Sequence, residues 1–367
     1  VPPHASTNPS TQAQKHPLHN KQASITSANP ISHFELCICL MATPSPVLQK
    51  PISNSATGSN GSIYEDPQAN FRENEHGCCT CFKVYKRRTH LTKMAQEYQV
   101  MKCLNDEGVP GIPRVFELHS AISVGNRSLP AIRMERFDGP DLQTYLNEQA
   151  QTNKVQYYKE TRTTSPFFSE HVVFDVICLK LMETLKKLHE IGAHRDIKLE
   201  NLILVKDANQ WDVKLIDFDF FVYNVQKRNP ASRKMKGTIL YASPEELRHE
   251  SEGQPSDIWA VGICVLVLLG QMDIINHPQK TKRGQELPFF SPNYVHTPEA
   301  FTNSMVRERI ERLAISENHK TLLSEMLNAN PMMRPDAATI CSRLLSPSLS
   351  PATVVAHTVL AGVLNSP

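Results

Sequence analysis

Two short segments of the chain carry the side chains that could do chemistry. The first, residues 194–201, spaces Asp196, Lys198 and Asn201 two and three residues apart, and the second holds Asp217, sixteen residues after Asn201. Asn201 and Asp217 offer the oxygen ligands that suit Mg²⁺, an ion that takes few protein ligands and shares phosphate oxygens. Asp196 is suited to accept a hydroxyl proton, and Lys198 to neutralise a phosphoryl group during its transfer. The spacing therefore indicates phosphoryl-transfer chemistry.

A hairpin between the two segments would bring them together. The apolar runs 202–205 and 213–216 have the composition of strands, and a polar turn around residues 207–210 separates them. An antiparallel hairpin returns the chain close to its starting point. We therefore expect Asp217 to lie beside Asn201, so that both oxygen ligands converge on one point.

The bulk composition sets limits on the class of protein. The 367-residue chain is long enough for one large two-lobed unit or for two domains. Hydrophobic residues make up 40% and charged residues 21%, as in an ordinary soluble globular protein. A net charge of +2 is too small to argue for binding to nucleic acid or to a membrane. The longest apolar run, residues 258–269, is too short to cross a bilayer and predicts a buried helix rather than a membrane span.

The nine cysteines lack the spacing of a disulfide framework, and no signal segment opens the chain, which favours a reducing compartment. We therefore expect an intracellular protein, located in the cytoplasm, the nucleus or both. Zinc binding is a rival interpretation for His76, Cys78, Cys79 and Cys81. It is disfavoured because two of these cysteines are adjacent and no second ligand pair follows at finger spacing.

A glycine-containing segment partly matches a phosphate-covering loop. Ala56 stands at the first glycine position of that pattern, Gly58 and Gly61 at the next two, and Ile63 at the following valine position. Such a loop needs residues without a Cβ because its backbone N–H groups approach phosphate oxygens closely. A polar glycine-serine linker is the alternative, but the location upstream of the other motifs favours the phosphate loop.

A strand and a helix follow this loop, and each contributes one charge. Residues 78–86 form a strand-like run around Lys83, and residues 92–104 have apolar side chains at helical spacing around Glu97. The two charges lie fourteen residues apart, so we expect Lys83 and Glu97 to form an ion pair. The alternative for either residue alone is a solvated charge.

Together, HRDIKLEN at residues 194–201, Asp-Phe-Asp at 217–219 and GTILYASPE at 237–245 resemble the motifs of the eukaryotic protein kinase family. The resemblance covers about residues 47–345. The lysine two residues after Asp196, together with GTILYASPE, is similar to the serine/threonine branch rather than the tyrosine branch. This resemblance implies an α+β, bilobal protein-kinase-like fold: a small lobe (about residues 47–137) with an antiparallel sheet and one main helix, and a larger, mainly helical lobe (about 138–345). Residues 1–46 are expected to be disordered, and residues 346–367 to be a loose tail.

The resemblance also implies a role for each site residue. Asp196 would be the catalytic base, Lys198 would steady the γ-phosphate of ATP, and Asn201 and Asp217 would hold Mg²⁺, or alternatively Mn²⁺. Besides the phosphate loop, the ATP-binding residues would be Cys81, Lys83, Glu97, Met134, Glu135, Phe137 and Asp141. In this set the cysteine and the methionine face the adenine, residues 135–137 form the hinge that reads its edge, and the last aspartate bonds the ribose.

Three further residues would take part in control of the active site. Ser232 lies in a basic stretch, residues 227–236, and its phosphate would bind Arg195 through charge-assisted hydrogen bonds. The alternative is a basic loop that is merely solvated. Thr238 is the weaker regulatory candidate, because in the family pattern this threonine bonds the catalytic aspartate and lysine.

Three other residues would support the fold. Glu245 resembles the family glutamate that pairs with Arg334. Asp257 begins the apolar helix and is expected to cap backbone N–H groups of the catalytic loop, because a buried carboxylate needs such donors.

The chain departs from the family pattern at three places. Ala56 replaces the first glycine of the phosphate loop, and the interval between Ile63 and Lys83 is longer than usual. Asp219 replaces the glycine of the metal loop, which should bias that loop toward one state and could alter the demand for metal. The stretch 272–296 matches no expected element.

The function favoured by the sequence is transfer of the γ-phosphate of ATP to a serine or threonine hydroxyl of a protein substrate. A pseudokinase or scaffold module is the alternative, motivated by Ala56 and Asp219, although Lys83, Asp196, Asn201 and Asp217 are all retained. A small-molecule kinase is disfavoured because it would be expected to lack GTILYASPE and Arg334. The sequence carries no prediction of oligomeric state.

Overall fold

The computed structural model describes most of the chain between residues 47 and 346. The described residues are 47–48, 52, 61–67, 79–87, 90–151, 157–158, 163–164, 166–207, 210–224, 237–250, 253–271 and 299–346. The expectations for residues 1–46, for the stretch 272–296 and for the tail after residue 346 lie outside this part of the chain.

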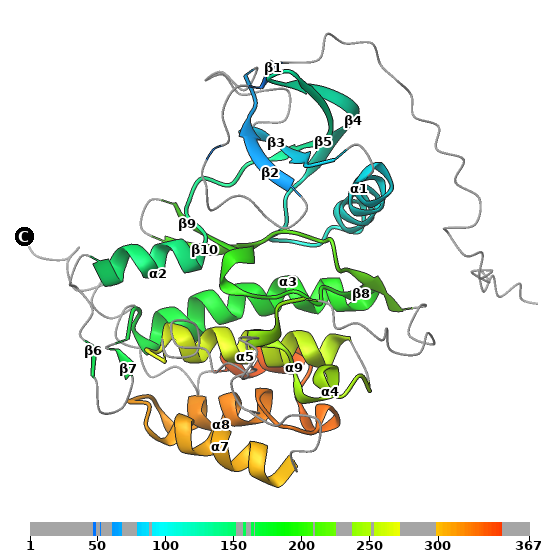
Figure 1. Cartoon of the computed structure of the whole chain (residues 1–367). Helices are drawn as coiled ribbons and strands as arrows, with labels where there is room; N and C mark the ends of the chain where they lie inside the picture. The colour runs from blue at the N-terminus through cyan, green and yellow to red at the C-terminus, as the bar shows by residue number, and fades with distance from the viewer. Residues whose placement is uncertain are drawn as a thin grey trace, which may run out of the picture. The chain divides into compact units, whose positions relative to one another are not determined.

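A five-stranded sheet forms the N-terminal part, in the order β1-β4-β5-β3-β2 (Figure 1). Its strands are β1 Val47–Leu48, β2 Gly61–Glu65, β3 Thr80–Tyr85, β4 Val115–Val124 and β5 Arg127–Glu135. The expected sheet is confirmed, but it is mixed rather than wholly antiparallel. Only the β1–β4 pair is parallel, because the two-residue strand β1 joins the edge in the direction of β4.

Strand β3 carries Lys83 and is buried along its whole length. Side chains alternate between the two faces of a strand, so Cys81, Lys83 and Tyr85 share one face while Phe82 and Val84 share the other. The second face packs within a small apolar cluster of the sheet, whereas the first face joins the main core. The sequence alternation thus places the lysine on the face that is turned toward the main core.

Helix α1, Leu91–Asp106, packs against β4 and β5 (Figure 1). Its buried side chains recur at intervals of three and four residues, which defines one face of a helix. They are Met94, Glu97, Val100, Met101 and Leu104. A glutamate on this face must find a partner, because an unpaired buried charge is costly.

The remaining described chain is mainly helical, as predicted. Its α-helices are α2 Leu142–Gln151, α3 Leu179–Ile191, α4 Pro244–Leu247, α5 Gln254–Leu268, α7 Glu299–Glu311, α8 Glu317–Met326 and α9 Ala337–Leu344. A π-helix, η2 Val172–Cys178, runs directly into α3. The short 3-10 helices are η3 Leu199–Asn201, η5 Ile239–Tyr241 and η6 Pro331–Met333.

Helix α5 lies in the core of this helical part. All of its residues from 256 to 268 are buried, in agreement with the predicted buried helix. None of the helices in the described ranges is both long enough and apolar enough to cross a membrane.

Two strands of this part form the predicted hairpin. Strands β9, Leu202–Asp207, and β10, Gln210–Leu215, pair antiparallel with Leu202 opposite Leu215. The Ile216 N–H then donates to the Asn201 carbonyl at 3.0 Å. The short strands that complete the described chain are β6 Tyr157–Tyr158, β7 Thr163–Thr164, β8 Gly192–Ala193 and β11 Val222–Tyr223. The hairpin returns the chain to Asn201 one residue before Asp217.

Candidate active site

One buried carboxylate holds the start of the catalytic loop. Asp257, in the first turn of α5 and 1% exposed, accepts the backbone N–H groups of His194 at 2.9 Å and Arg195 at 2.8 Å. His189 Nε2 lies 3.0 Å from the same carboxylate. Burial alone would raise the pKa of Asp257, but its interactions with His189, His194 and the loop backbone hold that pKa below its ordinary value. The predicted cap on the loop backbone is therefore present.

The Asp196 carboxylate is contacted by the side chains of Lys198, Thr238 and Asn201. Lys198 Nζ lies 2.9 Å from one of its oxygens, and the Thr238 hydroxyl donates to the other at 3.1 Å. Lys198 also donates to the Thr238 hydroxyl at 3.0 Å, which closes a ring of contacts. The neighbouring Gly237 has a φ of +82°, and a Cβ there would lie 2.6 Å from the Arg195 carbonyl. This glycine lets the chain bring Thr238 next to the catalytic loop.

Asn201 and Asp217 suit a divalent metal through the chemistry of their oxygens. The Asn201 amide nitrogen donates to the Asp196 carbonyl at 2.8 Å and to its carboxylate at 3.1 Å, which leaves the amide oxygen to act as a ligand. Burial disfavours the Asp217 carboxylate, but the charge and hydrogen bond of Lys83 lower its pKa. An ionised carboxylate and an amide oxygen are the hard ligands that Mg²⁺ takes.

The backbone at two of these positions is unusual. Arg195 has a φ of +69° and Asp217 a φ of +68°, in the left-handed region that residues with a Cβ rarely adopt. Of the non-glycine residues with positive φ in the described chain, only His249 lies elsewhere. Such conformations persist where the surrounding structure enforces them, and they concentrate at functional sites.

Lys83 lies within a group of carboxylates. Its Nζ is 2.6 and 2.8 Å from the two Glu97 oxygens and 2.8 Å from an Asp217 oxygen. The expected ion pair between β3 and α1 is therefore present, and it extends to Asp217. Burial disfavours the ammonium form, but the charges of Asp217 and Glu97 raise the pKa of Lys83 above its ordinary value.

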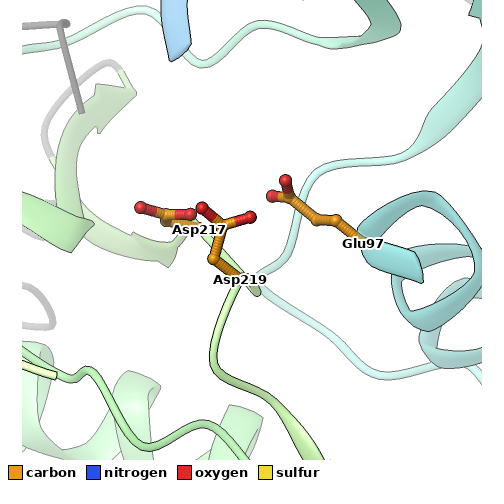
Figure 2. Close-up of side chains that lie close together, drawn as sticks. All are labelled: Glu97, Asp217 and Asp219. Atoms are coloured by element: carbon orange, nitrogen blue, oxygen red, sulfur yellow. The ribbon is translucent and has the colours of Figure 1, made fainter. Parts of the chain in front are cut away.

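Asp219, at the position of the family glycine, brings a third carboxylate to this group. The side chains of Glu97, Asp217 and Asp219 point toward one another (Figure 2). One ligand oxygen of each lies within 4.8 Å of the other two. Asp219 lies 3.9 Å from Lys83 Nζ. Burial, opposed by Lys83 and reinforced by the charges of both aspartates, raises the pKa of Glu97 to about 8. Three acidic side chains thus face one ammonium group, and a cation held by Asp217 would offset the negative charge of the two aspartates.

The zinc interpretation gains no support within the described residues. His76 and Cys78 lie outside them, Cys79 is exposed and Cys81 is buried in β3. In this part of the chain, the three carboxylates around Lys83 are the only clustered group of potential metal ligands.

The phosphate-loop residues are described in part. Ala56 and Gly58 lie outside the described chain, while Gly61 begins β2 and Ile63 lies opposite Lys83 in the β2–β3 pair. A Cβ on Gly61 would lie only 2.8 Å from a backbone carbonyl of β3. The strand pairing therefore supplies a packing reason for this glycine, and its phosphate contact stays a prediction.

The candidate adenine-binding residues lie on adjacent strands and in the segment that follows. Cys81 and Met134 are directly opposed in the β3–β5 pair, and both are buried. The Glu135 N–H donates to the Arg114 carbonyl at 2.8 Å, and its carboxylate accepts from the Arg114 guanidinium at 3.1 Å. The hinge contact of Phe137 with the adenine edge stays a prediction.

Asp141 has a local partner instead of an evident ligand-facing role. Its carboxylate accepts the Thr144 backbone N–H and hydroxyl, both at 2.8 Å. These bonds cap the start of α2. Its predicted ribose contact therefore stays a prediction.

Arg195, in the catalytic loop, is buried. It lines a small cavity together with Glu246 and Asp257. Burial lowers the pKa of Arg195, and the charges of these two carboxylates oppose that effect. Ser232 lies outside the described residues. The predicted phosphate contact is therefore untested, and the guanidinium already has carboxylates nearby.

The predicted pair between Glu245 and Arg334 is present as a two-point contact. The guanidinium nitrogens lie 2.6 and 2.8 Å from the two carboxylate oxygens, and both residues are buried. Burial would raise the pKa of Glu245, but the hydrogen bonds from Arg334 lower it. This pair ties α4 to the segment before α9.

Sequence reasoning missed one residue of the site. Tyr85 is fully buried, and its hydroxyl donates to Glu97. The signal was present in the strand period, because a residue two positions after Lys83 must share its face. A family pattern that ends at the lysine gives no reason to examine it.

Comparisons with known proteins agree with this geometry. Residues 57–345 match the protein kinase domain family. The chain is 28% identical over 242 residues to serine/threonine-protein kinase PLK4 of Drosophila grimshawi, covering 65% of this chain and 28% of that protein. It is 40% identical over 112 residues to the probable serine/threonine-protein kinase mkcF of Dictyostelium discoideum, covering 30% and 16%. It is 28% identical over 186 residues to human serine/threonine-protein kinase PAK 4, covering 49% and 28%.

The chain thus spans less than a third of the length of each of these relatives. The family match, in contrast, extends over most of this chain, from before the Lys83 strand to the end of α9. ATP and a divalent metal are the cofactors that such a match implies. On this evidence the chain belongs to the protein kinase family.

Proposed function

We propose that this chain is an ATP-dependent protein serine/threonine kinase. The observation that carries the proposal is the ring of contacts among Asp196, Lys198 and Thr238. It fixes a carboxylate next to a cation, and both lie beside the Asn201 and Asp217 oxygens that suit a metal. A substrate hydroxyl and a phosphate need this combination of groups.

Each residue has a stated task in this proposal. Asp196 accepts the proton of the substrate hydroxyl, and Lys198 balances the charge on the phosphoryl group. Lys83, held by Glu97, binds phosphate oxygens of ATP. Mg²⁺ held by Asn201 and Asp217 would supply further charge neutralisation.

The preference for serine and threonine rests on two supports. Lys198 follows Asp196 by two residues, as in the serine/threonine branch that the sequence resembles. The three relatives named above are all designated serine/threonine-protein kinases. We also propose an intracellular location, since none of the cysteines in the described residues forms a disulfide.

Radiolabelled ATP with generic protein substrates and Mg²⁺ or Mn²⁺ tests the proposal. We expect label on serine or threonine, and its loss in Asp196→Asn. Asp212→Asn is the matched control, because Asp212 lies on the β9–β10 hairpin, where it binds Lys214 at 2.6 Å away from the Asp196 contacts. Binding of ATP without any transfer by the parent would favour the pseudokinase alternative, and label on tyrosine alone would reject the serine/threonine assignment.

A further inference from the structure

Glu97 has a second hydrogen-bond donor besides Lys83. Tyr85 is 0% exposed, lies on the same face of β3 as Lys83, and donates its hydroxyl to Glu97 Oε2. Burial raises the pKa of Tyr85, so the hydroxyl keeps its proton and remains a donor. Helix α1 is therefore tied to β3 at Glu97 by two side chains, a lysine and a tyrosine.

The second donor matters because Lys83 is shared. An ammonium group has three N–H donors, and two of them point to Glu97 while the third points to Asp217. Asp219 is a further competitor at 3.9 Å. When Lys83 turns to a phosphate, it must give up at least one of these bonds. The tyrosine bond to Glu97 does not depend on that exchange.

The ring and the hydroxyl of Tyr85 serve different partners. The Lys83 ammonium lies 5.7 Å from the ring centroid, within range of a cation–π interaction. The hydroxyl contacts Glu97. A phenylalanine at this position would therefore keep the ring against Lys83 and remove only the donor to Glu97.

We propose that Tyr85 is a positioning residue, which holds Glu97 against Lys83 before nucleotide binds and so raises the affinity for MgATP. The proposal rests on the function proposed above, since it takes Lys83 as the phosphate-binding lysine. Without the hydroxyl, Glu97 would spend part of its time away from Lys83. The apparent affinity then falls in proportion to the fraction of molecules that are competent to bind.

This reasoning predicts a specific kinetic pattern for Tyr85→Phe. Saturating ATP restores the paired state, because phosphate bound to Lys83 favours it. We therefore expect KM and Kd for MgATP to rise by about three- to tenfold, which lies within the range for the net contribution of one ordinary hydrogen bond. We expect kcat to stay within about twofold of the parent value. A loss of folded protein would instead lower kcat at unchanged KM.

Tyr98→Phe is the matched control. Tyr98 lies one residue after Glu97 on α1, and its hydroxyl donates to the Phe116 carbonyl at 3.5 Å. Both variants thus remove a tyrosine hydroxyl that ties α1 to the sheet, but only one removes a donor to Glu97. The full chain is used for every variant, with steady-state phosphorylation and with equilibrium binding of MgATP.

A selective rise in KM and Kd for Tyr85→Phe, with Tyr98→Phe equal to the parent, supports the proposal. Equal Kd values for the parent and Tyr85→Phe overturn it, and so does an equal rise in both variants. If the parent binds MgATP but transfers no phosphate, the Kd comparison still decides the role of Tyr85, while the proposed function fails. If the parent transfers phosphate and Tyr85→Phe is unchanged, the proposed function stands and this proposal fails.

Discussion

Two buried charged groups of the site are compensated in opposite ways. Around Asp257, one carboxylate receives two backbone N–H groups and a histidine nitrogen, all within 3.0 Å. Around Lys83, one ammonium faces three carboxylates, and one of these is 3.9 Å away. The first group is satisfied by the protein alone. In the second group, three acidic side chains share one ammonium group.

This difference separates a group that stabilises the structure of the site from a group that takes part in its chemistry. A buried carboxylate whose partners all come from the protein, two of them backbone N–H groups of one loop, fixes that loop, and changing it should cost both stability and activity. A group with excess negative charge is suited to bind a cation that is not part of the chain. Changing it should cost activity while the fold remains. Variants of each group test whether this division holds.

The largest effect is expected for Lys83→Met. The variant removes the phosphate-binding ammonium and keeps an apolar stem of similar length, so it should abolish phosphate transfer. It also leaves three carboxylates without their cation, but protonation of Glu97, whose pKa is already raised to about 8, would relieve the repulsion. We therefore expect a cooperative thermal melt with little loss of Tm.

Lys86→Met is the control, since Lys86 lies three residues further along the chain and is exposed. Transfer at the parent rate by Lys83→Met, measured with radiolabelled ATP, would show that another lysine binds the phosphates.

Asp217→Asn should lower kcat by about a hundredfold or more, because metal-assisted charge neutralisation contributes several kcal/mol. Folding should change little, since the asparagine amide oxygen can still accept a hydrogen bond from Lys83, whose Nζ lies 2.8 Å from the Asp217 carboxylate in the parent. The effect should also depend on which of Mg²⁺ and Mn²⁺ is supplied. Asp212→Asn, on the adjoining hairpin strand, is expected to match the parent. An unchanged rate in Mg²⁺ for Asp217→Asn would remove Asp217 from the metal site.

The sequence could predict parts of both charged groups. Lys83 and Glu97 were predicted to pair from a strand, a helix and their separation, and the structure has them 2.6 Å apart. Asp217 was predicted to lie beside Asn201 because an antiparallel hairpin between them returns the chain to its start, and β9 and β10 form that hairpin. The cap by Asp257 followed from one carboxylate at the head of an apolar helix. Local sequence patterns, together with the geometry of an antiparallel hairpin, were sufficient for these predictions.

Other features depended on packing that no local pattern contains. Tyr85 shares a strand face with Lys83, but only the position of α1 brings its hydroxyl to Glu97. The approach of Asp219 to Lys83 depends on the path of the chain after the hairpin. The sequence did not predict the capping bonds of Asp141, because its motif suggested a contact with a ligand rather than a helix cap.

Asp257→Asn tests the support group. The asparagine amide oxygen can accept only some of the hydrogen bonds that the carboxylate accepts. The amide NH₂ group is itself a donor and would face a backbone N–H group of the loop. One N–H of the His194–Arg195 pair would then be buried without an acceptor, at a cost of about 1–3 kcal/mol. We expect a clear fall in Tm together with roughly a tenfold lower kcat.

Asp336→Asn is the matched control, because Asp336 caps α9 through the Thr339 N–H at 2.7 Å, and asparagine caps helices about as well as aspartate. A loss of activity in Asp257→Asn without any loss of Tm would contradict the division between support and chemistry.

The last test concerns Glu246, a carboxyl group whose environment lies between those of the two groups above. Glu246 is buried in the first turn of α4, and its oxygen accepts the Ser243 backbone N–H and hydroxyl, both at 2.9 Å. Burial raises the pKa of Glu246 to about 7, and the serine hydrogen bonds oppose that rise only in part. Asp257, with more donors, has a lowered pKa in a similarly buried position.

A raised folded-state pKa gives a definite sign to the pH dependence of stability. The folded protein prefers protonated Glu246, so this contribution is complete below the unfolded pKa of about 4.5 and is lost as pH rises through about 7. The shift corresponds to a change on the order of 3 kcal/mol. Glu246→Gln cannot titrate and keeps an oxygen for the Ser243 N–H. Its unfolding free energy should therefore fall less than that of the parent between pH 5 and pH 8.

Urea denaturation at several pH values in that range measures the difference between the two slopes. Other titrating groups, including Glu97, contribute equally to both proteins, so the difference isolates Glu246. Glu250→Gln, at an exposed position of the same segment, should keep the parental slope. Parallel curves for the parent and Glu246→Gln would mean that Glu246 is charged throughout this range in the folded protein. In that case Arg195, whose charge interacts with Glu246, would be its effective partner, and this carboxyl group would belong with Asp257 rather than between the two cases.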